Sequence, residues 1–83
     1  MTVGQIIKRE RLAKGLSMRA FAKKADVSLA TIFNTESGKH VPTNSTLKSL
    51  AEALDMKTSD ILLEAVADVV KTLDKTKEGA WYG

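Results

Sequence analysis

Apolar residues recur along the chain three and four positions apart, which is the spacing of one face of an α-helix. Val3, Ile6 and Ile7 begin such a face, and no segment alternates between apolar and polar residues as a strand does. The pattern therefore predicts an all-α fold. The predicted helices run from about Val3 to Lys14, from Met18 to about Ala25, between Ser28 and Gly38, from behind Thr43 through Leu54, and from Thr58 or Ser59 to about Asp74.

Residues that start and stop helices separate these segments. Ser17 and Ser28 each stand before an apolar pattern, where a hydroxyl can accept a hydrogen bond from the first turn. Gly15 and Gly38 follow the first and third segments and are expected to adopt the left-handed conformation that ends a helix. Asp26, between the second and third segments, tolerates a positive φ better than most residues. The turns are therefore expected to be tight.

The composition is that of one small domain. The 83 residues include no cysteine, so neither disulfides nor thiolate metal sites can stabilise it. Hydrophobic residues make up 43% and aromatic residues 5%, which predicts a mainly aliphatic core. No apolar run approaches the roughly 18 residues that span a bilayer, and the N-terminus lacks the apolar block of a signal peptide. We expect a cytoplasmic protein that does not contact a membrane.

Charge is divided unevenly along the chain. Residues 1–48 carry nine Lys or Arg and three acids, a net charge of +6, whereas residues 49–83 carry four and seven, a net charge of −3. A basic front part favours a polyanionic partner. A solvated surface of mixed charge explains the same division equally well.

No pattern in the sequence indicates catalysis or a cofactor. His40 is the single histidine, and no group of His, Cys and carboxylates has the spacing of a metal site. No Ser/His/Asp order, glycine-rich phosphate loop or pair of acid/base carboxylates occurs. Asp60, Glu64 and Asp68 share one helical face, and we interpret them as exposed solubilising charges. An enzyme, a metal ion and a small-molecule cofactor are not expected.

Residues 16–54 carry, in order, Leu16-Ser17, Ala22 four positions before Asp26, Val27-Ser28, Ile32, Glu36, Gly38, Pro42, Thr46-Leu47, Leu50-Ala51 and Ala53-Leu54. This order resembles the helix-turn-helix core of the Cro/lambda-repressor family of bacterial and phage transcriptional regulators. With the first helix, the resemblance covers about residues 3–63. It implies a five-helix all-α domain, in which the second and third helices form the helix-turn-helix. It also implies a structural ion pair between Arg11 and Glu36.

The resemblance implies which residues contact DNA bases, because in this family the third helix lies in the major groove. Asn34 can hold adenine through a donor and an acceptor, and the apolar side chains beside it can pack against thymine methyl groups. We therefore expect A·T-containing sites to be favoured. The expected base-contacting residues are Leu29, Ala30, Phe33 and Asn34, with Thr31 near them.

Contacts to the phosphate backbone are expected from three places around that helix. They are the start of the second helix, the loop after the third, and the N-terminus of the fourth, where free amides favour an anion. Met18 stands where many family members have glutamine. Plain solvation is the alternative for the loop residues. The expected phosphate-contacting residues are Ser17, Met18, Arg19, Lys39, His40, Thr43, Asn44 and Ser45.

The apolar pattern of the last helix continues beyond the family core. The core is expected to close near Leu63, so residues 1–63 form the DNA-binding domain, 64–76 an extension and 77–83 a tail. The spacings of four, three and four residues, shown by Leu62, Val66, Val69 and Leu73, are typical of a helix–helix seam and favour a dimer interface. The alternative is a longer cap folded onto the same core, helped by Trp81; the role of Tyr82 stays open. The expected interface residues are Leu62, Val66, Val69, Val70 and Leu73.

These observations favour a homodimeric, sequence-specific DNA-binding transcriptional regulator, most plausibly a repressor that reads a palindromic operator. It would act in the cytoplasm, on the nucleoid when bound to DNA. The alternative is a protein-interaction module such as an antitoxin, which binds a partner protein and also its own promoter. A third possibility is a nucleoid-coating protein with little sequence preference and a steep salt dependence.

Overall fold

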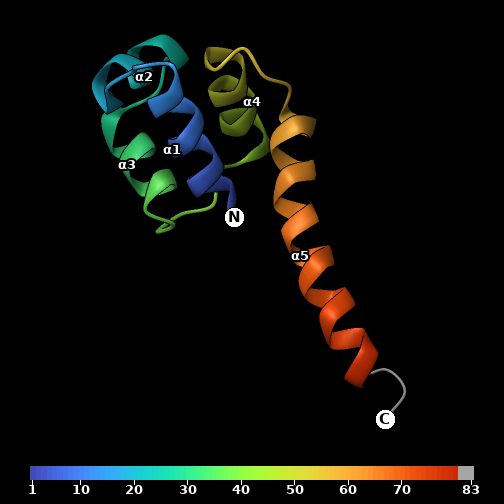
Figure 1. The fold of residues 1–83 in the computed structure, drawn as a ribbon. Coiled ribbons are helices and arrows are strands. Elements are labelled where there is room, and N and C mark those ends of the chain that lie inside the picture. Colours follow the sequence, from blue (N-terminus) through green and yellow to red (C-terminus); the bar gives the residue numbers. More distant parts are fainter. Residues whose placement is uncertain (81–83) are drawn as a thin grey trace.

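The computed structural model describes the backbone of residues 1–80 and the side chains of residues 1–67, 69 and 70 (Figure 1). Within this part the fold is all-α, as predicted. The first four helices form a cluster, and the fifth contacts α1 and α4 and then projects away from them (Figure 1). The helices are α1 (Val3–Ala13), α2 (Met18–Ala25), α3 (Leu29–Glu36), α4 (Asn44–Ala53) and α5 (Thr58–Ala80).

Hydroxyl caps fix where the helices begin. Ser17, Ser28 and Thr43 each accept a hydrogen bond from a backbone N–H three residues later, at 3.0, 3.1 and 3.3 Å. Thr2 caps α1 in the same way, and the backbone N–H of Thr2 donates to Oε1 of the Gln5 side chain at 2.9 Å. Each such cap stabilises its helix by about 1 kcal/mol. The starts of α2, α3 and α4 are those that the sequence predicts.

The turn between α2 and α3 is closed by Asp26, whose φ of 57° and ψ of 46° are left-handed. Its backbone N–H is directed at the Ala22 and Lys23 carbonyls, and the N–H of Val27 donates to the carbonyl of Ala22 at 3.0 Å. Asp26 therefore adopts the left-handed conformation that glycine often has after a helix, at a conformational cost of about 1 kcal/mol. The result is a short connection that sets α3 firmly against α2.

One aliphatic core joins all five helices. Its fully buried members come from every helix and surround Phe21, the single aromatic side chain among them. Because α5 supplies one of these residues, its first turn belongs to the same core. The fully buried side chains are Ile6, Ile7, Phe21, Ile32, Leu50, Leu54 and Ile61.

Gly4 allows α1 to cross α3 at close range. A Cβ built on Gly4 would lie 2.0 Å from the carbonyl oxygen of Thr35, so no other residue fits without moving a backbone. The same crossing buries Thr35, which is 3% exposed. The inner face of α3 is therefore fixed against α1 by backbone contact as well as by side chains.

The fifth helix differs from expectation in two ways. It ends at Ala80 and not near Asp74, so residues 77–80 are helical where a tail was predicted. Lysine and glutamate favour helices, and no glycine occurs in this stretch before Gly79. The core, which was expected to close near Leu63, is closed by Ile61, and Leu63 is 68% exposed. Predictions for the side chain of Leu73 and for Trp81 and Tyr82 lie outside the described residues.

Among the described residues, none of the helices combines the length and the apolar character that crossing a bilayer requires.

Candidate nucleic-acid interface

The third helix has a buried face and an exposed face. Ile32, Thr35 and Glu36 point inward and are buried. On the outer side, Leu29 is 43% exposed and Phe33 is 56% exposed. Large apolar side chains that lie together on an exposed face often mark an interaction site. The outer face of α3 therefore has the character of a contact surface.

A hollow of ≈ 540 Å³ opens between the outer faces of α2 and α3. It brings together four of the five expected base-contacting residues, with two more from the start of α2. Thr31 is the exception: its hydroxyl lies 2.8 Å from that of Ser28, so it is engaged with the cap of α3. The lining residues, which we call the reading hollow, are Met18, Arg19, Leu29, Ala30, Phe33 and Asn34.

Met18 lies differently from the other residues expected to contact phosphate. Its side chain is half-buried, packs against the core and lines the reading hollow. Its backbone N–H remains at the N-terminus of α2, where helices leave amide donors unsatisfied. The side chain and the backbone of Met18 therefore face different environments, and the sequence does not reveal this.

The remaining residues of the expected phosphate-contacting set are exposed, at the N-termini of α2 and α4 and in the loop after α3. Ser17 and Arg19 lie at the N-terminus of α2, and the hydroxyls of Thr43 and Ser45, 3.3 Å apart, lie at that of α4 beside Asn44. Lys39 and His40 occupy the loop after α3, and the backbone N–H of His40 donates to the carbonyl of Asn34 at 3.2 Å. Hydroxyls, helix N-termini and cations thus occur in the segments that precede and follow α3 in the chain, and Arg19 also lines the reading hollow. This combination suits a polyanion.

The C-terminal end of α3 is held by a buried ion pair between Arg11 and Glu36. Arg11 donates from Nε to Oε2 at 2.7 Å and from Nη2 to Oε1 at 3.0 Å, and the two side chains are 7% and 2% exposed. Arg11 also donates from Nη1 to the carbonyl of Leu16 at 2.7 Å. One guanidinium therefore links α1, the turn after it and α3.

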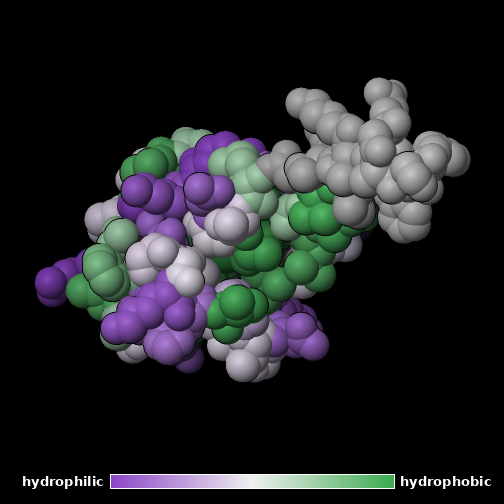
Figure 2. Space-filling view, turned by 90° about the horizontal axis from the view of Figure 1, so that it is seen from below, coloured by the Kyte–Doolittle hydropathy of each residue, from purple (hydrophilic) through white to green (hydrophobic). Residues whose placement is uncertain are grey.

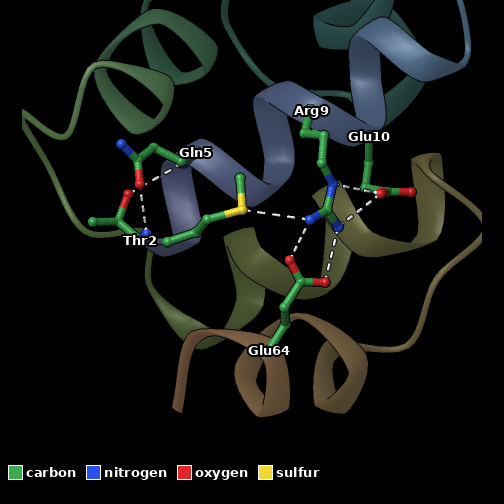
Figure 3. A network of polar contacts seen from close by, with 6 residues as sticks. Thr2, Gln5, Arg9, Glu10 and Glu64 are labelled. Atoms are coloured by element: carbon green, nitrogen blue, oxygen red, sulfur yellow. Dashed lines mark hydrogen bonds and ion pairs between the residues drawn. The ribbon is translucent and has the colours of Figure 1, made fainter. Parts of the chain in front are cut away.

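A second network, which sequence reasoning missed, joins α1 to α5 (Figure 3). Arg9 donates to both carboxylate oxygens of Glu64, with Nη2 to Oε1 at 2.8 Å, and its Nε donates to Glu10 at 3.0 Å. The hydrogen bond from Arg9 holds the pKa of Glu64 below its ordinary value. The sequence suggested that Glu64 is an exposed solubilising charge, and this interpretation is wrong, because Glu64 is paired with Arg9. Local spacing could not identify the pair, because its partners are 55 residues apart.

No cluster of three or more histidine, cysteine or acidic side chains suited to a metal ion occurs within the part of the chain that the structure describes. The exposed residues on and around α3 offer apolar groups, hydrogen-bond donors and positive charge.

The sequence model of the helix-turn-helix family matches residues 7–62. Among solved structures, the fold is similar to that of the clp gene regulator ClgR from Corynebacterium glutamicum, with a TM-score of 0.76 and 24% identity over 90% of this chain and 80% of that one. It is also similar to SinR, the master regulator for biofilm formation, in complex with DNA, with a TM-score of 0.70 and 29% identity over 74% and 98%. The SinR protein in complex with SinI gives a TM-score of 0.73 and 24% identity over 95% and 81%. No curated protein sequence matches the chain.

Proposed function

Because the chain belongs to the Cro/lambda-repressor type of the helix-turn-helix family, we propose that it is a homodimeric repressor that reads a palindromic operator with α3 in the major groove. As a member of this family, the chain is a DNA-binding transcriptional regulator and not an enzyme. Residues 1–63 would form the DNA-binding domain, and the rest of α5 would form the dimer contact.

The observation that carries base reading is the outer face of α3. Leu29 and Phe33 are exposed there beside Asn34, while the opposite face of the same helix is buried. A helix held in this way can enter the major groove, which is wide enough to admit it. The fold of SinR, 29% identical to this chain, has been determined in complex with DNA. We infer direct base contacts from Leu29, Ala30 and Phe33, from Asn34 as the hydrogen-bonding member, and from Thr31 at the edge.

Phosphate contacts would supply most of the affinity and hold the helix in register. The exposed groups around α3 support this assignment: a hydroxyl-capped N-terminus on each of α2 and α4, and a cationic loop between α3 and α4. The net charge of +6 in residues 1–48 favours the same partner. The proposed residues are Ser17, the backbone of Met18, Arg19, Lys39, His40, Thr43, Asn44 and Ser45.

The dimer is supported by the apolar face of α5. Leu62, Val66, Val69 and Val70 are 42%, 54%, 58% and 46% exposed, and Figure 2 shows hydrophobic residues gathered along this helix. A continuous apolar surface of this kind usually marks a protein contact. Two copies related by a two-fold axis would present two α3 helices to half-sites about 10 base pairs, or a multiple of this, apart.

The test is selection of bound duplexes from a random pool at about 150 mM salt, because affinity for DNA depends steeply on ionic strength. A motif with two-fold symmetry and A·T-containing half-sites is the expected result. A single asymmetric motif would contradict the dimer. Binding of every duplex with a steep salt dependence, and no enrichment, would favour a nucleoid-coating protein.

A second candidate is a protein-interaction module such as an antitoxin, in which α5 holds a different protein. The breadth of the apolar face favours it: Leu63, 68% exposed, lies to one side of the seam formed by Leu62, Val66 and Val69. SinR, which has this fold, has been determined in complex with the SinI protein. If substitution of Val69 abolishes the biological activity of the protein while substitutions on α3 leave that activity unchanged, the protein-interaction module is the correct assignment.

A further inference from the structure

We propose that the reading hollow is a subsite for the C5-methyl group of an operator thymine, and that Met18 is the residue that makes the subsite selective. The inference rests on the proposed function, because it takes the ligand to be a base pair in front of α3. It adds a chemical identity for the group bound and a role for a side chain on α2.

The lining of the hollow is unusual for a surface that meets DNA. Met18, Leu29, Ala30 and Phe33 contribute apolar groups, and of the lining residues only Arg19 and Asn34 have polar side chains. The major groove presents mainly hydrogen-bond donors and acceptors, and the thymine methyl is its characteristic apolar group. A guanine or cytosine edge placed against these side chains would lose water without gaining a hydrogen-bond partner, which is unfavourable. The hollow therefore selects the methyl group.

The surroundings of the hollow favour DNA over an apolar peptide or a lipid as the occupant. Arg19 lies at its edge, and the capped N-terminus of α2 begins at Ser17 beside it. Lys39 and His40 follow the other end of α3. Cations and helix N-termini bind phosphate groups. An apolar subsite between such groups matches the one ligand that carries a methyl group between two phosphate backbones.

Met18 can act selectively because it is held in place. Its side chain is half-buried and packs against the core while it lines the hollow, so it is anchored on the protein side of the subsite. A methionine side chain is polarisable and unbranched, and it fits closely against a flat or irregular apolar group. Leu29 and Phe33 on α3 would lie on the other side of the methyl group. The subsite therefore requires residues of both helices.

The experiment compares thymine with deoxyuridine, which lacks only the methyl group, at each thymine of the enriched operator. Loss of one buried methyl corresponds to roughly a fourfold loss of affinity, and roughly fifteenfold when the change is made in both half-sites. We expect this loss at one symmetric pair of positions and little change elsewhere. A 5-methylcytosine at the same pair should bind more tightly than cytosine, because it restores the methyl group.

The protein variants test the role of Met18. Met18→Ala and Met18→Gln should bring the ratio of thymine to deoxyuridine affinity close to one. Met56→Ala is the matched control, because Met56 is also half-buried and packed against the core but lines a different hollow near α4 and α5, and it should leave the ratio unchanged. Circular dichroism would verify that each variant is folded.

Three negative results have different meanings. Equal affinity of the unmodified protein for thymine and deoxyuridine at every position of an enriched motif would overturn the methyl subsite and leave operator reading intact. If folded Met18→Gln keeps the same ratio of thymine to deoxyuridine affinity as the unmodified protein, the role of Met18 is overturned. The absence of any enriched motif would instead contradict the proposed function itself.

Discussion

Arg11 of α1 and Glu36 of α3 are 25 residues apart in the sequence and share two hydrogen bonds, at 2.7 and 3.0 Å, inside the protein. Because both side chains are buried, the pair differs in kind from a surface ion pair: removal of one partner leaves the other charge without water or a counter-ion. It also fixes the end of the helix that we propose to read DNA.

Glu36→Ala should therefore lower the free energy of unfolding by about 3–5 kcal/mol, because it leaves the buried Arg11 guanidinium without a counter-charge. Urea unfolding followed by circular dichroism measures the change. The double variant Arg11→Met/Glu36→Leu should be more stable than Glu36→Ala, since it removes both charges and keeps the volume. A loss below about 1 kcal/mol, as for an exposed pair, would show that the pair is not structural.

Asn34→Ala should weaken binding to the selected operator by about 1–3 kcal/mol, because the amide is the hydrogen-bonding group of the proposed base-contacting set. Fluorescence anisotropy with the operator and with a scrambled duplex measures the effect. The loss should be confined to the operator. Asn44→Ala is a control of the same residue type at the start of α4, and it should weaken both duplexes equally. An equal loss on both duplexes for Asn34→Ala would contradict base reading.

Lys39→Ala should weaken binding to all duplexes similarly and reduce the slope of log affinity against log salt by about one unit, because one phosphate contact is lost. The same anisotropy titration at several salt concentrations gives the slope. Lys57→Ala is the matched control: it is an exposed lysine in the connection between α4 and α5, and should leave the slope unchanged. Identical slopes for both variants would show that Lys39 is solvated and not in contact with DNA.

Val69→Asp should convert the proposed dimer to a monomer, because it places a charge in the middle of the apolar seam of α5. Sedimentation velocity measures the change in mass. Ala67→Asp adds the same charge two residues earlier, at an exposed position away from that seam, and should leave the dimer intact. If the unmodified protein sediments as a monomer, α5 serves another partner.

Glu64→Gln should reduce thermal stability slightly at pH 7, and the difference from the unmodified protein should vanish in acid. The pKa of Glu64 is lowered from 4.5 by its hydrogen bond to Arg9, so the stabilisation is complete above pH 4.5 and is lost as the pH falls through the lowered value. The effect is small because the pair is exposed. Scanning calorimetry at pH 7 and pH 3 measures it; a difference that grows in acid would have the wrong sign.

Much of this structure could be predicted because its signals are local. Ser17, Ser28 and Thr43 cap helices within three residues of themselves, and Asp26 ends α2 through its own φ. Ile32 and Glu36, two of the marks that carry the family resemblance, fall on the buried face of α3, and the opposite face is exposed. Short-range hydrogen bonds and the 3.6-residue period are properties that one sequence displays directly.

The features that could not be predicted depend on how helices that are separate in the sequence pack against one another. Arg9 and Glu64 meet only because α5 packs across α1, and no local pattern joins them. Met18 lines the reading hollow because α2 packs beside α3 at a particular angle. The sequence of either helix alone does not predict that angle. Leu63 is exposed because it lies between Ile61 and Ala65, which pack against the core, and so falls on the opposite face of α5; its hydrophobicity was misleading.

The projection of α5 away from the other helices (Figure 1) gives it the mechanics of a lever. Of the described residues, those of α5 that meet the body, Ile61, Glu64 and Ala65, lie in its first two turns, and the helix then continues to Ala80. At 1.5 Å per residue the free arm from Ala65 to Ala80 is about 22 Å long, so a tilt of about 10° at its base moves the tip by about 4 Å. The rise of a base pair is about 3.4 Å. In the proposed dimer, a few degrees at the fulcrum beside Arg9 would thus decide how many base pairs separate the two half-sites.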